Sequence, residues 1–183
     1  IRDRSVSRGL GDVYKRQMTE SLGLKLGDYF NSGMLLMNMK ELRNVHLAEH
    51  FLYLLNKYHF DCVAPDQDYL NSMCYGKIEY LDSCWDAMPN RNKPEIENPK
   101  IIHYNLFDKP WCYDDIQYQD YFWEYAKQSV YYDKIKAYKA AYTDKQKEDD
   151  HAHLLDLFRR AGTNADTEVT FRKVLESGEK VRL

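Results

Sequence analysis

The apolar residues of this chain fall into short runs and one-sided stripes rather than into one long stretch. Met34 to Met39 is a short apolar run after Gly33, which is typical of a buried strand. Ile78 to Leu81 and Ile101 to Tyr104 predict two more short strands. Because none of these runs approaches the length of a membrane-spanning helix, no membrane span is expected.

The segments between and after these runs have helical apolar spacing. A helix from Leu42 to Tyr58 is predicted by apolar residues three and four positions apart, namely Ala48, Phe51, Leu52, Leu55 and Tyr58. A second helix is predicted to start at Pro65-Asp66, with Asp66 as its N-cap and Gly76 as its stop. Beyond Trp111 the pattern predicts three more helices, at Tyr118 to Tyr125, Tyr132 to Tyr142 and Ala152 to Arg160. Strands with interspersed helices predict an α/β fold with a helical C-terminal tail.

Net charge and cysteine spacing argue against several classes of protein. The formal net charge of -3 offers no basic surface, which argues against a nucleic-acid partner. The four cysteines contain no Cys-x-x-Cys pair, so neither a zinc ribbon nor a thioredoxin-like site is indicated. No signal peptide is evident, and the expected location is the cytoplasm, where thiols stay reduced.

The first seventeen residues differ from the rest. Ile1 to Gln17 is Arg-rich, punctuated by Gly and without apolar periodicity. It resembles a translated sequencing-adapter scar, and a native basic tail is the alternative. We therefore expect residues 1–17 to be a non-native scar or a disordered tail.

Two local patterns suggest a metal. His46-Leu47-Ala48-Glu49-His50 matches the H-x-x-E-H signature of one class of zinc peptidases. Helical geometry places both histidines opposite the predicted apolar stripe, on a solvated face, which disfavours a catalytic zinc site. Asp66-Gln67-Asp68 resembles a D-x-D motif, but residues two apart on a helix point in different directions and cannot chelate one ion together.

A third pattern combines a histidine with a lysine. His103 follows the predicted strand Ile101 to Tyr104, and Lys109 comes six residues later, before Pro110 and Trp111. A neutral histidine ring can bind a metal, and a lysine supplies a point charge for phosphate oxygens. Taken alone, this segment is better explained by a structural histidine than by a ligand site.

Together the motifs carry a family resemblance. Tyr29-Phe30-Asn31-Ser32-Gly33 comes first, Pro65-Asp66-Gln67-Asp68-Tyr69-Leu70-Asn71 second, and His103-Tyr104 with Lys109-Pro110-Trp111 last. In this order they resemble glycosyltransferase family 8, which includes bacterial lipopolysaccharide galactosyl- and glucosyltransferases and the glycogenins. The likeness spans Asp28 to Trp111 and is looser in the helical tail.

The resemblance implies a GT-A fold, that is, a Rossmann-like α/β domain that transfers a hexose with retention. The donor would be UDP-glucose or UDP-galactose, the acceptor a saccharide or glycolipid of lipopolysaccharide, capsule or cell-surface glycan, and the cofactor Mn²⁺ or Mg²⁺. The resemblance implies a role for each motif residue: Asn31 and Ser32 line the donor sugar, Asp66 binds its hydroxyls, Gln67 lies near the anomeric carbon, His103 binds the metal, and Leu106 and Lys109 lie along the diphosphate.

The resemblance also implies a division of the chain. Residues 18–115 would be the C-terminal part of an N-terminally truncated GT-A domain, and residues 116–183 a helical extension that either caps the domain or contacts the inner membrane face peripherally. The uridine pocket and the true D-x-D would lie in about 100 further residues, so the chain by itself is expected to be inactive. One departure is Leu106, which stands where the family often has Gly. The alternatives are a non-catalytic sugar- or protein-binding module on the same scaffold and the zinc peptidase.

Overall fold

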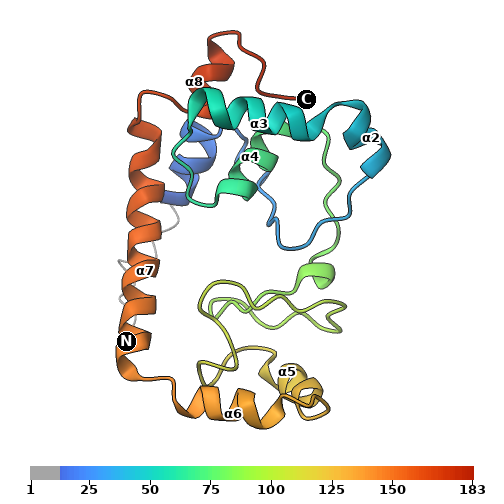
Figure 1. The fold of residues 1–183 in the computed structure, drawn as a ribbon, viewed down its shortest axis with the longest axis vertical. Coiled ribbons are helices and arrows are strands. Elements are labelled where there is room, and N and C mark those ends of the chain that lie inside the picture. The colour runs from blue at the N-terminus through green and yellow to red at the C-terminus, as the bar shows by residue number, and fades with distance from the viewer. Residues whose placement is uncertain (1–12) are drawn as a thin grey trace. The chain divides into compact units, whose positions relative to one another are not determined.

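The computed structural model describes residues 13–183 and divides into two compact units. Unit 1 consists of Ile1–Tyr80 and Leu154–Leu183, and unit 2 consists of Leu81–His153. Helices account for most of the regular structure in the described part (Figure 1). The chain leaves unit 1 after Tyr80 and re-enters it within a long helix, so unit 1 is built from both ends of the sequence.

Unit 1 is a cluster of short helices. Residues 13–16 are helical and lead into the π-helical turn η1 (Gln17–Ser21). It further contains α2 (Met39–Asn44), α3 (Leu47–Tyr58), α4 (Pro65–Met73), the C-terminal part of α7 (Asp144–Thr163), η3 (Asn164–Asp166) and α8 (Phe171–Glu176). Unit 2 contains η2 (Ser83–Asp86), α5 (Gln119–Ala126), α6 (Tyr132–Ala140) and the N-terminal part of α7.

Aromatic rings from distant parts of the sequence form the core of unit 1. The Phe171 ring stacks on that of Phe60 at 3.8 Å between centroids and meets the Tyr69 ring edge-on at 4.9 Å. Aromatic pairs of this kind contribute about 0.5–1.5 kcal/mol beyond the burial of their area. The buried core residues come from both ends of the chain: Leu22, Leu24, Leu54, Phe60, Cys62, Tyr69, Met73, Phe171, Val174 and Val181.

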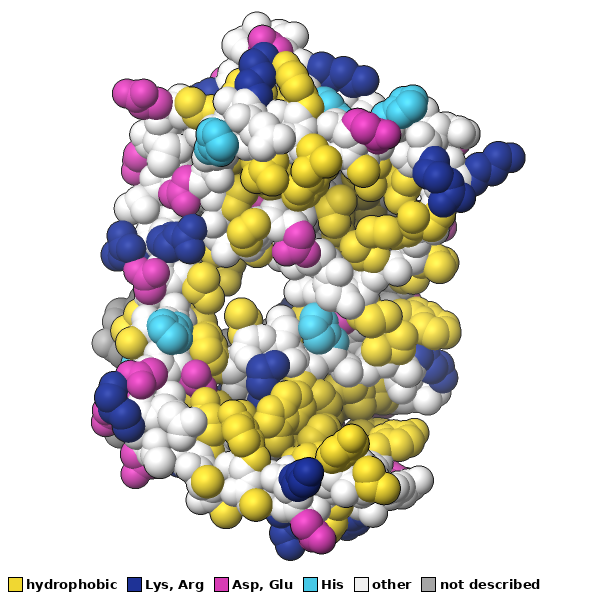
Figure 2. Space-filling model, viewed as in Figure 1, with side chains coloured by type: hydrophobic (Ala, Val, Ile, Leu, Met, Phe, Trp, Pro, Cys, Tyr) yellow, Lys and Arg dark blue, Asp and Glu magenta, His cyan; other side chains and the backbone are white. Residues whose placement is uncertain are grey.

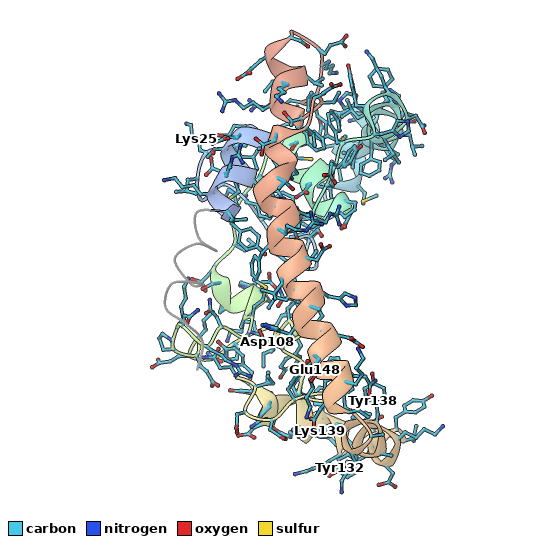
Figure 3. All side chains as sticks on the ribbon, turned by 90° about the vertical axis from the view of Figure 1, so that its left-hand side faces the viewer. Lys25, Asp108, Tyr132, Tyr138, Lys139 and Glu148 are labelled. Atoms are coloured by element: carbon cyan, nitrogen blue, oxygen red, sulfur yellow. The ribbon has the colours of Figure 1, made fainter. Side chains whose placement is uncertain are left out.

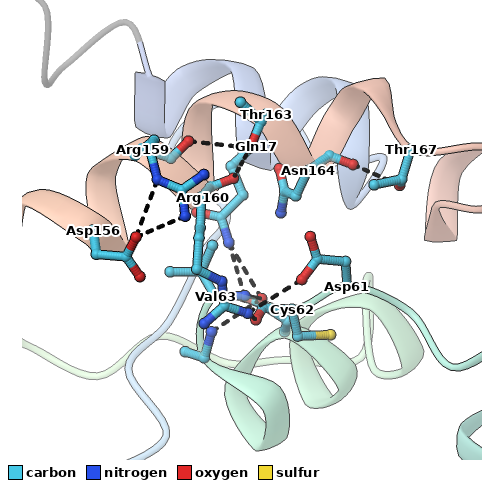
Figure 4. Close-up of polar contacts among 12 residues, drawn as sticks. Gln17, Asp61, Cys62, Val63, Asp156, Arg159, Arg160, Thr163, Asn164 and Thr167 are labelled. Carbon is cyan, nitrogen blue, oxygen red and sulfur yellow. Dashed lines mark hydrogen bonds and ion pairs between the residues drawn. The ribbon is translucent and has the colours of Figure 1, made fainter. Parts of the chain in front are cut away.

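Polar contacts join the C-terminal segment to the rest of unit 1. The Arg160 guanidinium donates to Asp61 Oδ1 at 3.1 Å and to the Cys62 carbonyl at 2.6 Å (Figure 4). Arg16 donates to the Gly162 carbonyl at 2.8 Å and forms an ion pair with Asp166. These contacts hold the last turns of α7 against the loop before α4 and against residues 13–21.

The predicted helix from Leu42 to Tyr58 is two helices. The chain breaks at His46, whose φ of 55° lies in the left-handed region. The His46 N–H bonds to the Arg43 carbonyl and ends α2, whereas the His46 carbonyl accepts from His50 and starts α3. The buried face also differs from the predicted stripe: Leu54 is fully buried, and Leu52 is 53% exposed.

The second predicted helix exists with a different cap. Ala64 is the N-cap of α4, Pro65 occupies the first helical position, and Asp66 lies inside the first turn. Pro is favoured at this position because its missing N–H would have no partner there. The helix ends at Met73, and Gly76 lies in the following turn with a φ of 81°.

The α/β expectation, and with it the GT-A sheet, is wrong for the part of the chain that the structure describes. Between residues 13 and 183 the only β pairing is an isolated parallel bridge between Ala87 and Ile102. The run from Met34 to Asn38 is irregular, with Leu36 92% exposed, and Met39 is the first residue of α2. A strand needs a neighbour along its length to satisfy its backbone N–H and C=O groups, and in the described residues Ile101 to Tyr104 pairs with Ala87 through a single bridge.

Unit 2 is organised around aromatic side chains. The Trp111 and Phe122 rings lie 4.9 Å apart, and the Tyr104 ring meets the Phe122 ring edge-on at 5.9 Å. On α6, Lys139 donates to the carbonyls of Pro110 at 2.9 Å and Tyr113 at 2.7 Å. Tyr132, Tyr138 and Lys139 all project from α6 (Figure 3). The helices after Trp111 were therefore predicted correctly in kind, and α7 also takes in the charged run from Asp144 onward.

No helix in residues 13–183 combines the length and the apolar character needed to cross a bilayer. All four cysteines are free thiols.

Candidate functional site

The first two sequence motifs meet in unit 1. The loop Tyr29 to Gly33 packs on the first two turns of α4 through hydrogen bonds to its side chains. The Asn71 side-chain amide forms two hydrogen bonds with the backbone of Phe30, accepting from its N–H at 2.9 Å and donating to its carbonyl at 2.9 Å. The Ser32 hydroxyl donates to Asp66 Oδ2 at 2.7 Å. Motifs that are more than thirty residues apart in sequence thus form one polar cluster.

Gln67 occupies the centre of this cluster. Its amide oxygen accepts from the Ser32 N–H at 2.9 Å, and its amide nitrogen donates to the Tyr29 hydroxyl at 2.8 Å. Burial decreases along the helix start, from fully buried Asp68 through half-buried Gln67 to exposed Asp66. The cluster therefore presents Asp66 and part of Gln67 to solvent and keeps Asp68 inside.

Asp68 is a buried carboxylate surrounded by donors. It accepts from the Tyr29 hydroxyl at 2.6 Å, from the Val63 N–H at 2.9 Å and from the Ala64 N–H at 3.2 Å. The Gln17 amide adds two contacts of 3.2 Å to the same carboxylate (Figure 4). Burial raises the pKa of Asp68, and these hydrogen bonds act in the opposite direction. Asp68 bonds the backbone just before α4 and so takes over the capping role predicted for Asp66.

The third motif lies in unit 2, where the isolated bridge positions its histidine. The Ala87 N–H donates to the Ile101 carbonyl, and the His103 N–H donates to the Ala87 carbonyl, both at 2.9 Å. This places His103 Nδ1 3.1 Å from Asp86 Oδ1. A carboxylate at Nδ1 fixes the proton there and leaves Nε2 as the nitrogen that can accept a ligand.

Leu106 and Lys109 lie in the turn that follows. Leu106 has a φ of 44° and is half exposed. Lys109 Nζ donates to the Tyr104 carbonyl at 3.2 Å and lies 5.1 Å from the centroid of the Trp111 ring. The left-handed backbone explains why a glycine suits the position of Leu106.

The structure thus brings Asn31, Ser32, Asp66 and Gln67 together in unit 1 and places His103, Leu106 and Lys109 on one loop of unit 2. Sequence reasoning missed the roles of Tyr29, which accepts from Gln67, and of Asp68, which holds Tyr29. It also missed Asp86, which orients His103. Tyr29 and Asp68 were visible within the motifs, but Asp86 lies 17 residues from its histidine with no motif to mark it.

The pair His46 and His50 does not form a shared site. His46 precedes α3 and is 75% exposed beside Glu49, whereas His50 Nε2 lies 2.8 Å from the Val181 carbonyl. Across residues 13–183 no three histidine, cysteine or acidic side chains gather as a metal site would require. His103 with Asp86 fits one part of a ligand set, since an imidazole oriented by a carboxylate is a common metal ligand.

Comparisons with known proteins confirm the family resemblance. Residues 12–115 match the family described as "Glycosyl transferase family 8", and the chain belongs to this family. A Haemophilus influenzae protein named "Putative glycosyltransferase" is 30% identical over 108 residues, which is 55% of this chain and 33% of the relative. General stress protein A of Bacillus subtilis is 28% identical over 102 residues, 46% of this chain and 36% of the relative.

A third relative is lipopolysaccharide 1,2-glucosyltransferase of Escherichia coli, 29% identical over 98 residues, which is 47% of this chain and 29% of the relative. The chain spans about a third of the length of these curated relatives. No solved structure matches it significantly.

Proposed function

We propose that this chain contributes donor-binding and catalytic residues to a retaining glycosyltransferase, which moves a hexose from a UDP-sugar to a saccharide or glycolipid acceptor. The observation that carries the proposal is the hydrogen-bonded cluster of the Tyr29 to Gly33 loop with the start of α4. It supports a donor-sugar site because a carboxylate, an amide and a hydroxyl converge there, and these groups recognise sugar hydroxyls. The family match supports the reaction class.

In this proposal Asp66 accepts hydrogen bonds from the donor-sugar hydroxyls, with Asn31 and Ser32 beside it. Exposure of the Asp66 side chain leaves its second oxygen accessible, since the Ser32 hydroxyl occupies only Oδ2. Gln67 lies near the anomeric carbon and stabilises positive charge that develops there through its carbonyl dipole. An amide is a weak nucleophile, so retention proceeds by attack on the face that the leaving group vacates.

The loop of unit 2 serves the leaving group. Lys109 neutralises charge on the departing diphosphate, and the backbone around Leu106 lies along it. His103 would contribute Nε2 to a divalent cation, for which Mn²⁺ or Mg²⁺ is proposed. When bound, such an ion supplies a positive charge that offsets the negative charge of the leaving nucleoside diphosphate. Asp86 keeps His103 in the required tautomer.

The test is the release of UDP from UDP-glucose and from UDP-galactose with Mn²⁺ present, measured in the gene product at its natural length. We expect metal-dependent release that falls by about 100-fold in His103→Ala and in Lys109→Ala, since each removes one stabiliser of the leaving charge. His59→Ala and Lys77→Ala are matched controls, because neither residue lies in the candidate clusters.

Release that is equal in wild type and His103→Ala would contradict the assigned role of His103. If the protein neither binds nor turns over either UDP-sugar, the proposed reaction is wrong.

A peripheral membrane contact is proposed for α5 and α6. A shallow apolar groove of about 480 Å³ is lined by Trp111, Phe122, Tyr131, Lys134, Ile135 and Tyr138, and hydrophobic side chains gather on this part of unit 2 (Figure 2). Tyrosine and lysine together suit a membrane interface with anionic lipid. Sedimentation with phosphatidylglycerol vesicles should carry the protein down, and Tyr131→Ala with Tyr138→Ala should weaken this more than the control Tyr53→Ala. Equal binding by all variants would contradict the assignment.

A further inference from the structure

The Tyr29 hydroxyl connects two residues of the donor cluster that do not contact each other through hydrogen bonds of their own. It donates to Asp68 Oδ1 at 2.6 Å and accepts from Gln67 Nε2 at 2.8 Å. Gln67 Oε1 in turn accepts from the Ser32 N–H at 2.9 Å. The result is a continuous chain of hydrogen bonds from the fully buried Asp68 to the half-buried loop.

With Asp68 as a carboxylate, the direction of every bond in this chain is fixed. Its Oδ2 accepts from the backbone N–H groups of Val63 and Ala64, and its Oδ1 accepts from the Tyr29 hydroxyl. The Tyr29 hydroxyl has one proton, which goes to Asp68, so toward Gln67 it can only accept. A backbone N–H on the other side of Gln67 can only donate. The Gln67 amide therefore has one allowed orientation, with Oε1 toward Ser32 and Nε2 toward Tyr29.

We infer that Tyr29, held by Asp68, is a positioning residue for Gln67: it anchors the nitrogen end of the amide, as the Ser32 N–H anchors the oxygen end, and so fixes how the amide is aimed at the reacting carbon of the donor sugar. The inference rests on the proposed function, because it assigns Gln67 that reaction site. With one N–H and one lone pair committed to the protein, Gln67 retains one of each for the substrate. An amide held at its oxygen end alone could turn and aim its carbonyl dipole away from the reacting carbon.

Removing the Tyr29 hydroxyl leaves the ring in place and frees the amide. In Tyr29→Phe, Gln67 Nε2 loses its acceptor, while Oε1 still accepts from the Ser32 N–H, so the amide is held at its oxygen end and can turn about that bond. We expect kcat for UDP release to fall by about 10- to 100-fold, because small errors in the placement of a reacting group cost rates of this size. KM for the UDP-sugar should change by less than about threefold, since Asp66 and Ser32 still bind the sugar.

Tyr75→Phe is the matched control. The Tyr75 hydroxyl donates to Asp28 Oδ2 at 3.1 Å, so this variant also removes a tyrosine–aspartate bond from unit 1 without touching Gln67. If the role of Tyr29 is merely structural, each variant should lose activity in proportion to its loss of thermal stability, and this proportion should be the same in Tyr29→Phe and Tyr75→Phe. A positioning role predicts loss of kcat in Tyr29→Phe alone.

A double-mutant cycle separates the inference from the function on which it rests. Gln67→Ala should lower kcat strongly, and adding Tyr29→Phe to it should lower kcat no further, because Tyr29 acts through Gln67. If Gln67→Ala has no effect, the proposed role of Gln67 fails. If Gln67→Ala is impaired and Tyr29→Phe either has no effect or multiplies the loss, the positioning role fails while the function stands.

A readout without activity addresses the same point. The side-chain amide protons of Gln67 give an NMR signal whose exchange with water is slowed by the bond to Tyr29. We expect faster exchange and a shifted signal in Tyr29→Phe and an unchanged signal in Tyr75→Phe. An unchanged Gln67 signal in Tyr29→Phe would overturn the inference.

Discussion

Leu106 shows how much a single backbone angle can constrain a position. Its φ of 44° places a branched side chain in the left-handed region, which costs an L-residue about 1–2 kcal/mol. Leu106→Gly removes this strain and so stabilises the folded state. The greater freedom of glycine in the unfolded chain lowers the stability by about 0.4–1 kcal/mol and offsets part of that gain. Because the side chain is half exposed, little burial is lost. We expect a net stabilisation of about 0.5 kcal/mol by urea unfolding; Leu106→Ala, which keeps a Cβ, should give no such gain.

Asp68 is a second position where one residue decides local stability. Asp68→Ala leaves the Val63 and Ala64 N–H groups and the Tyr29 hydroxyl without their acceptor. Each unsatisfied buried donor costs about 1–3 kcal/mol, so we expect a loss of at least about 3 kcal/mol in thermal or urea unfolding. Asp68→Asn should cost less, because its amide oxygen can still accept from the two backbone groups. Equal losses in both variants would show that one acceptor oxygen is not enough and that the charge or the second oxygen of the carboxylate is what matters.

At the scale of elements, helices were predicted well and their edges poorly. Apolar spacing located the helical segments because periodicity is a local property of the sequence. The break at His46 and the cap at Ala64 depend on which nearby backbone groups bond to one another, which apolar spacing does not report. Asp68, for example, accepts from the backbone N–H groups four and five residues before it, and Ala64 rather than Asp66 is the N-cap of α4.

The N-terminus of the terminal helix α8 is stabilised by the side chain of its N-cap residue, Thr170. The Thr170 hydroxyl accepts from the Lys173 N–H at 3.2 Å, and Phe171 and Val174 of this helix lie in the core of unit 1. Thr170→Ala removes the cap, and we expect a loss of about 1 kcal/mol in the free energy of unfolding. Thr170→Ser keeps the hydroxyl and is the control. A loss in Thr170→Ser as large as in Thr170→Ala would mean that the buried methyl group, not the cap, stabilises the helix.

At the scale of the whole molecule, the motifs predicted the family while the apolar runs predicted the wrong fold class. Met34 to Met39 and Ile101 to Tyr104 are short runs for which strand and irregular structure cannot be separated by periodicity. Whether such a run becomes a strand depends on a neighbour with free backbone groups, which no local pattern reports. The motif residues of unit 1 nevertheless came together, since hydrogen bonds between their side chains need no sheet.

The abundance of tyrosine gives the whole molecule a measurable response to alkali. Burial raises the pKa of Tyr69 in unit 1 and of Tyr104 in unit 2 to about 12. For Tyr29 and Tyr113 burial also raises the pKa, and for Tyr142 the bond to Asp150 does so. Because the folded state favours the neutral phenols, their contribution to stability is complete below the unfolded pKa of about 10 and is lost as the pH rises further.

We therefore expect the tyrosinate absorbance of the native protein to stay below that of the denatured protein up to a pH of about 10. It should then rise between pH of about 10 and 12, together with loss of the helical circular dichroism signal. In concentrated denaturant the same phenols should ionise near a pH of about 10 without a lag. Tyr69→Phe tests the assignment, because it removes a hydroxyl that has no hydrogen-bond partner in the described part of the chain and should leave the protein folded. Late-ionising absorbance should fall in this variant. If every tyrosine ionised near the ordinary value while the helical signal persisted, the aromatic cores of both units would be more open to water than the structure shows.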